Sequence, residues 1–317
     1  MLFSILKLPA AIAIHFYCKH ITINKKKFLN EDGPLLIAAN HPNSFLDAII
    51  LATIFKKPVY SLARGDAFAN NFYTRLLNAM NILPVYRISE GAENLEHNYK
   101  TFETCKEIFK KNGVVLIFSE GRCINEWHLR PLKKGTARLT FSSWDNGIPL
   151  KILPLGINYN SFQRFGKTIE LNFGEIISTE NFKYSAESFG KDIVNFNSRL
   201  NEQLSELVLE FDINDTVGIE KHFARPASLT KKILLCLPAA IGYLFHLPLY
   251  LPVKSFSAKA TKKNDHYDSV VVSLLMILYP IYLLIISIAV SFFIGWWSLL
   301  TFLIFPFTAW AYLQLKK

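Results

Sequence analysis

From Pro34 to about Asn160, short apolar runs alternate with stretches of helical periodicity. Apolar runs of about four to eight residues separated by helices are typical of βα units, whose strands pair in parallel. The runs predict five strands: Leu35 to Ala39, Val59 to Leu62, Ile82 to Tyr86, Val114 to Phe118 and Ile152 to Ile157. Pro84 removes a backbone hydrogen-bond donor from the strand Ile82 to Tyr86, so we expect this strand to be short or irregular. The pattern predicts an α/β fold with a mostly parallel sheet flanked by helices.

Two longer segments have apolar residues at the three- and four-residue spacing of an amphipathic helix. The first, Glu93 to Lys111, carries Leu95, Phe102, Cys105 and Phe109 on one face. The second runs from about Ser188 to Phe211, and its stripe consists of Ile193, Phe196, Leu200, Leu204, Leu207 and Phe211. We expect both helices to cover the sheet.

The composition points to a membrane. Hydrophobic residues make up 51% of the chain, which is high for a soluble domain. A net charge of +10 fits either nucleic acid or an anionic lipid surface. The lysines lie beside apolar stretches, and the sequence has no zinc-finger spacing and no basic helix with base-reading side chains. We therefore predict membrane lipid as a partner and no nucleic acid.

The four cysteines, Cys18, Cys105, Cys123 and Cys236, lack the paired short spacings of a disulfide framework. This usage indicates a reducing compartment. We expect the catalytic region to face the cytoplasm, on a bacterial inner membrane or an equivalent one.

Residues 1–23 are apolar and contain no acid, and Lys25, Lys26 and Lys27 follow them. A signal peptide is one interpretation, with Ala11-Ile12-Ala13 as a weak cleavage-like triplet. The positive charge, however, follows the apolar run, which is the wrong side for secretion. We predict a membrane-associated helix with a basic edge.

The C-terminal third predicts membrane helices. Lys231 to Val253 contains Pro238, Pro248 and Pro252, so we expect an interfacial or re-entrant segment. Val270 to Phe293 is long enough to cross a bilayer, and Trp296 to Leu315 can return. Lysines flank both ends of this hairpin, which by the positive-inside rule places both ends in the cytoplasm. The predicted domains are a membrane-associated segment (1–30), a central α/β domain (31–225), an interfacial segment (226–265) and a transmembrane hairpin (266–317).

His41 and Asp47 follow the first predicted strand. An imidazole oriented by a carboxylate can accept the proton of an attacking hydroxyl, and ligands gather at the carboxyl ends of parallel strands. The alternative is structural, because Ser44-Phe45-Leu46-Asp47 matches a capping box at a helix start.

Three further segments, each on or just after a predicted strand, are candidates for substrate binding. Arg87 follows the strand that begins at Ile82, and a guanidinium binds phosphate bidentately. Glu120 and Gly121 follow the Val114 strand and bring a carboxylate and an open backbone to the same edge. Lys151 to Gly156 is apolar and would form a wall for an acyl chain. Each segment alone also fits an ordinary loop, turn or core strand.

In this order the four segments resemble the conserved blocks of the glycerolipid acyltransferase family, which includes the lysophosphatidic acid and glycerol-3-phosphate acyltransferases. The resemblance covers about residues 30 to 165 and implies that the predicted domain 31–225 is an acyltransferase domain. It implies that His41 is the general base and that Asp47 orients it. It further implies that Arg87 binds the phosphate of the acceptor and that Glu120 and Gly121 help to bind the acceptor.

The sequence departs from the family pattern in three places. Five residues, Pro42 to Leu46, separate His41 from Asp47, one more than in the commonest pattern, so this loop must bulge. The longer spacing resembles a branch with fungal glycerol-3-phosphate and dihydroxyacetone-phosphate acyltransferases and bacterial relatives. Asn81 stands where a glycine usually opens the second block. In the third block, Arg122 and Cys123 replace the usual threonine and arginine, and either Arg122 or Lys134 is a candidate for the missing charge.

The resemblance implies an O-acyltransferase that moves a fatty acyl group from coenzyme A or acyl carrier protein to a phosphorylated glycerol or lysophospholipid. We expect no metal and no cofactor beyond this acyl donor. One alternative is a lipid hydrolase or transacylase with Ser44 or Ser119 as nucleophile, although neither lies in a Gly-x-Ser-x-Gly turn. The other is a noncatalytic protein that binds anionic lipid.

Overall fold

The computed structural model describes residues 2–86, 95–185 and 188–316. The chain divides into two compact units. The α/β unit comprises Met1–Leu8, Thr22–Asn158 and Glu170–Asn214. The helical unit comprises Pro9–Ile21, Tyr159–Ile169 and Asp215–Lys317.

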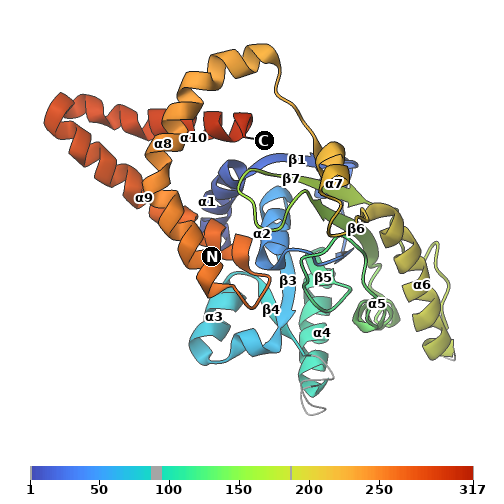
Figure 1. Ribbon diagram of the computed structural model, residues 1–317. Coiled ribbons are helices and arrows are strands. Elements are labelled where there is room, and N and C mark those ends of the chain that lie inside the picture. The colour runs from blue at the N-terminus through green and yellow to red at the C-terminus, as the bar shows by residue number, and fades with distance from the viewer. Residues whose placement is uncertain (1, 87–94, 186–187, 317) are drawn as a thin grey trace. The chain divides into compact units, whose positions relative to one another are not determined.

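One sheet of seven strands has the order β1-β7-β6-β2-β5-β3-β4 (Figure 1). The strands are β1 (Cys18–Ile23), β2 (Leu35–Ala39), β3 (Val59–Arg64), β4 (Ile82–Val85), β5 (Val114–Phe118), β6 (Lys151–Tyr159) and β7 (Lys167–Phe173). β2 runs parallel to β5 and β6, and β3 runs parallel to β4 and β5. β7 is antiparallel to β6, since the Gly174 N–H donates to the Pro154 carbonyl and the Asn160 N–H to the Thr168 carbonyl. The sheet is therefore mixed and mostly parallel, which confirms the predicted fold class.

The five predicted strands are all present. β2 and β5 have the predicted bounds, while β3 and β6 are longer and β4 ends at Val85. Pro84 is tolerated because β4 is the last strand of the sheet and has a free edge. All five residues of β2 are fully buried, as expected for a central parallel strand.

Two strands were missed. The helix expected over residues 1–23 ends early, because α1 spans Leu2–Tyr17 and the chain continues as β1. The β-branched run Ile21, Thr22 and Ile23 favours this extended conformation. β7 has no counterpart among the predicted strands, although Ile169, Leu171 and Phe173 are buried and alternate with polar residues.

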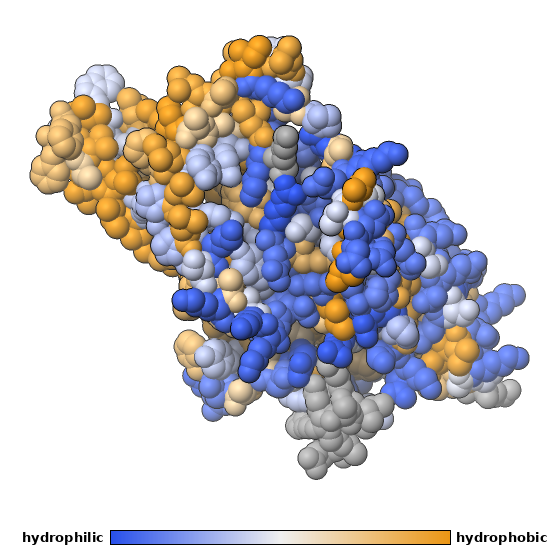
Figure 2. All heavy atoms as spheres, viewed as in Figure 1, coloured by the Kyte–Doolittle hydropathy of each residue, from blue (hydrophilic) through white to orange (hydrophobic). Residues whose placement is uncertain are grey.

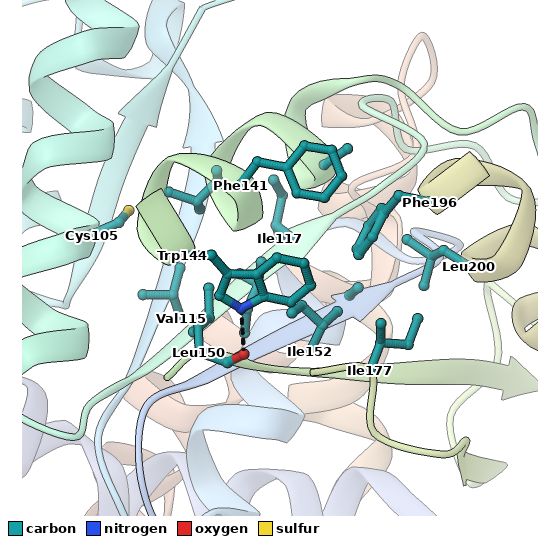
Figure 3. Packing of buried hydrophobic residues seen from close by; sticks show 14 of the residues in the cluster. Cys105, Val115, Ile117, Phe141, Trp144, Leu150, Ile152, Ile177, Phe196 and Leu200 are labelled. Atoms are coloured by element: carbon teal, nitrogen blue, oxygen red, sulfur yellow. Dashed lines mark hydrogen bonds between the residues drawn. The ribbon is translucent and has the colours of Figure 1, made fainter. Parts of the chain in front are cut away.

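The helices of the α/β unit are α2 (Ser44–Ile54), α3 (Asn71–Ala79), α4 (Leu95–Lys110), α5 (Gly135–Asp145) and α6 (Phe189–Leu207). The last two form a core with β2, β5 and β6 (Figure 3). Trp144 lies at its centre and donates its indole N–H to the Leu150 carbonyl at 2.9 Å. Phe196 and Leu200 of the predicted α6 stripe are fully buried in this core. The two predicted amphipathic helices therefore correspond to α4 and α6.

The helical unit contains α7 (Thr216–Phe223), α8 (Leu229–Ala260), α9 (Tyr267–Ile294), the 3-10 helix η6 (Gly295–Leu300) and α10 (Thr301–Leu315). Two described segments, Leu229–Ala260 and Tyr267–Leu315, are long and apolar enough to cross a membrane, by length and composition only. Hydrophobic side chains gather over α8, α9 and α10 (Figure 2). The three prolines expected to interrupt the segment after Lys231 lie within one continuous α8. The predicted hairpin is present as α9 and α10 joined by η6 (Figure 1).

α8 and α10 pack antiparallel and in close contact. A Cβ atom added at Gly242 would lie 2.1 Å from the Thr308 carbonyl oxygen, so only glycine fits there. Leu235, Ala239 and Ala311 are buried beside this contact. Small residues that let two helix backbones approach are typical of helix pairs in membranes.

A buried ion pair lies elsewhere in the helical unit. Lys167 at the start of β7 pairs with Asp268 in the first turn of α9, and both side chains have no exposed surface. The Tyr17 hydroxyl donates to the other carboxylate oxygen of Asp268. These bonds satisfy two groups whose burial alone would be costly.

Candidate functional site

The candidate site lies where β2 and β5 end side by side. Ala39 pairs with Phe118 in the last register position, and the Ser119 N–H donates to the Ala39 carbonyl at 2.8 Å. His41 and Glu120 follow these strands directly, so the parallel sheet places both at the edge where ligands bind in such folds.

The structure brings His41 and Asp47 together. The Nδ1 atom of His41 lies 2.9 Å from Asp47 Oδ2, and Asp47 has no exposed surface. The imidazole stacks on the Phe118 ring with centroids 3.6 Å apart, and 17% of the His41 side chain is exposed. No described residue bonds to Nε2. With its proton on Nδ1, the imidazole presents Nε2 as a proton acceptor.

Asp47 also binds the start of α2, although the helix begins one residue earlier than the capping box Ser44 to Asp47 predicts. Its Oδ2 atom accepts the Asn43 backbone N–H at 2.9 Å, and Asn43, not Ser44, is the N-cap residue of α2. One carboxylate oxygen therefore binds both the helix start and the His41 ring. The two interpretations of this motif are compatible.

The loop between His41 and Asp47, which was predicted to bulge, contains a residue in a special backbone conformation. Ser44 has a φ of 51°, in the left-handed region that non-glycine residues seldom adopt. Its N–H donates to the Sγ atom of Cys123 at 3.0 Å. Cys123 stands where the family usually has arginine, and in this structure it supports the loop that carries Asp47.

Glu120 contacts the backbone of His41. Its Oε2 atom accepts the His41 N–H and its Oε1 atom accepts the Arg130 N–H, both at 3.0 Å. Burial raises the pKa of Glu120, and the two N–H donors partly oppose this by stabilising the carboxylate. Glu120 thus fixes the position of His41 and of the loop that leads to Arg130.

The structure gives positions for three of the four remaining predicted site residues. Gly121 has a φ of 65°, which explains a glycine after Glu120. Arg122 is exposed on the following loop, and Lys134 is exposed at the N-cap of α5. Arg87, expected to bind phosphate, lies outside the described residues.

Sequence reasoning missed the polar residues that hold the His41 loop. Asn40 is buried and bonds to both backbone groups of Ile157, accepting its N–H at 2.7 Å and donating to its carbonyl at 3.1 Å. Asn125 donates to the Pro42 carbonyl at 2.7 Å. Asn40 stands directly before the histidine, whereas Asn125 gave no local signal because its partner is 83 residues away.

The serines of the hydrolase alternative are buried. Ser119 Oγ lies 3.0 Å from Thr136 Oγ1, and Ser44 is 3% exposed. Within the described part of the chain, the His41 ring forms no hydrogen bond with either serine. This geometry does not favour a serine nucleophile.

Comparison with known proteins gives three findings. The model of the family described as Acyltransferase matches residues 20–158. No curated protein matches the sequence. Among solved structures, the chain is similar to the 1-acyl-sn-glycerophosphate (LPA) acyltransferase PlsC from Thermotoga maritima, with 14% identity and a TM-score of 0.43. That match covers 71% of this chain and 81% of the other.

Proposed function

We propose that this chain, whose residues 20–158 match the model of the family described as Acyltransferase, transfers a fatty acyl group from an acyl thioester to a hydroxyl of a glycerophosphate or lysophospholipid. The observation that carries this proposal is the His41 ring, held at Nδ1 by Asp47 at 2.9 Å, with Nε2 bonded to no described residue. The donor is coenzyme A or acyl carrier protein.

The proposed reaction proceeds in one active site without a covalent enzyme intermediate. The Nε2 atom of His41 accepts the hydroxyl proton of the acceptor while the hydroxyl oxygen attacks the thioester carbonyl carbon. The new C–O bond forms and the C–S bond breaks. The departing thiolate then takes the proton from His41, which returns the imidazole to its neutral state. Asp47 stabilises the imidazolium that exists between these transfers.

Substitution of the base tests the proposal. His41→Ala should abolish thiol release from an acyl thioester in the presence of acceptor, measured with a thiol-reactive dye on the full chain in detergent. His222→Ala, at the exposed end of α7, is the matched control and should retain activity. Normal turnover by a folded His41→Ala variant would overturn the assignment of the base.

Arg87 provides a second test, which concerns the acceptor. If its guanidinium binds the acceptor phosphate, Arg87→Ala should chiefly raise the KM for a phosphorylated acceptor. A change confined to kcat would contradict the phosphate role. A panel of phosphorylated and unphosphorylated acceptors, offered with one labelled donor, would identify the substrate class.

We also propose that the α/β unit works on the cytoplasmic face of a membrane. Two apolar segments support membrane association. Lys254, Lys259, Lys262 and Lys263 precede the α9–α10 hairpin, and Lys316 follows it. By the positive-inside rule, this distribution favours a cytoplasmic location for both ends of the hairpin.

A further inference from the structure

The helical unit contains a basic pocket outside the candidate active site. This cavity of about 320 Å³ is lined by β1, the connection between α7 and α8, the first turn of α8 and the end of α10. Its charged and polar lining residues are Lys19, His20, Arg225, Ser228, Lys231 and Gln314. Of the lining residues that the structure describes, none is acidic.

The cations of this basic pocket repel one another. Burial lowers the pKa of Lys19, and the nearby charges of Lys231 and Arg164 lower it further. Burial also lowers the pKa of His20, with further contributions from Lys19, Lys231 and Arg225. A bound anion would relieve this repulsion.

The hydrogen-bond partners of the two lysines leave their charge uncompensated. Lys19 Nζ donates to the Lys316 carbonyl and Lys231 Nζ donates to Gln314 Oε1, each at 2.6 Å. Both acceptors are neutral. Among described residues, neither lysine pairs with a carboxylate. The lysines are therefore held in place with their charge available to a ligand.

The basic pocket lies at the start of an apolar helix. Leu229, Ile233, Leu234 and Leu237 lie on the same turns of α8 as Lys231, and each is about 70% exposed. The segment Leu229–Ala260 is long and apolar enough to cross a membrane. A phosphate bound at the start of such a segment would lie at the level of the lipid headgroups. We propose that the basic pocket binds the phosphate headgroup of an anionic membrane glycerolipid through Lys19, Arg225 and Lys231. The proposal does not depend on the proposed acyl transfer.

Equilibrium binding of a fluorescent short-chain phosphatidic acid to the full chain in neutral detergent tests the site. Arg225→Gln and Lys231→Gln should each weaken binding about fivefold, the effect of one cation near a charged lipid, and the double variant about 20-fold. Lys259→Gln is the matched control, because it removes one exposed charge from the opposite end of α8. The Arg225→Lys and Lys231→Arg variants keep the charge and should bind nearly as well as the parent chain.

Competition with the fluorescent probe distinguishes a lipid headgroup from a free phosphate as the ligand. If the ligand is a lipid, phosphatidic acid should displace the probe at much lower concentration than glycerol 3-phosphate or inorganic phosphate. Equal displacement by inorganic phosphate would overturn the lipid assignment. Equal loss of binding in Lys259→Gln, or no loss in the folded double variant, would overturn the site itself. His41→Ala should bind the probe normally, so failure of the proposed acyl transfer is distinguishable from failure of this site.

Discussion

His41 is held through its ring and through its backbone. Asp47 contacts the ring, Glu120 accepts the backbone N–H, and the His41 carbonyl accepts the Ile124 N–H at 3.3 Å. The pairing with Asp47 could be predicted from the sequence, because both residues lie in one short motif. The contact with Glu120 could not, because the role of a carboxylate 79 residues away depends on the register of β2 and β5.

Asn81 has a φ of 60°, which gives a physical reason for the glycine usual at this place in the family. Asparagine tolerates the left-handed region better than other non-glycine residues. Asn81→Gly should therefore leave the free energy of unfolding within about 0.5 kcal/mol of the parent, whereas Asn81→Val should lower it by about 1–2 kcal/mol. Chemical denaturation of the detergent-solubilised chain measures both. Equal stability of the two variants would show that the backbone conformation is not the constraint.

The parallel strands were predictable as elements because each is a short apolar run bounded by turn residues. β1 and β7 were not found, for two different reasons. The apolar character of α1 continues into Cys18, so composition gives no boundary where the helix ends. The alternation in β7 was a usable signal, but its pairing beside β6 depends on tertiary structure.

Among the helices, the contact between α8 and α10 depends on Gly242. A methyl group there would overlap the Thr308 carbonyl, so Gly242→Ala must separate the two helices. We expect a loss of about 1–3 kcal/mol in the free energy of unfolding, as for other overpacked sites. Gly190→Ala in α6 is the matched control. An added Cβ has no neighbour within 4 Å there, and alanine favours the helix by up to about 1 kcal/mol. Similar thermal unfolding of the two variants would contradict the close contact.

For the whole molecule, charge and apolar surface are distributed differently in the two units. The composition predicted a membrane protein, and the large hydrophobic surface of α8, α9 and α10 agrees with that prediction (Figure 2). The proposed orientation rests on the lysines at the helix ends, which the sequence shows directly. The continuous course of α8 through three prolines could not be foreseen, since isolated prolines usually end a helix.

Cysteine labelling in sealed inverted membrane vesicles tests this orientation. In a Cys123→Ser and Cys236→Ser background, Lys232→Cys and Lys263→Cys should both react with an impermeant maleimide from the cytoplasmic side. Trp297→Cys, in the η6 turn of the hairpin, should not. Burial raises the pKa of Cys18 and of Cys105 to about 12, so these thiols should stay unreactive. Labelling of Lys232→Cys and Lys263→Cys from opposite sides would contradict the proposed orientation.

The antiparallel packing of α10 on α8 links the two ends of the helical unit. Gln314, at the end of the hairpin, accepts a hydrogen bond from Lys231 at the start of α8. Under the proposed orientation, Ser228 and Lys316 therefore share one compartment. The stretch of α8 that packs along α10 lies at the same membrane depth as that helix, so a label attached at its start should report on the same face as one attached at the end of α10.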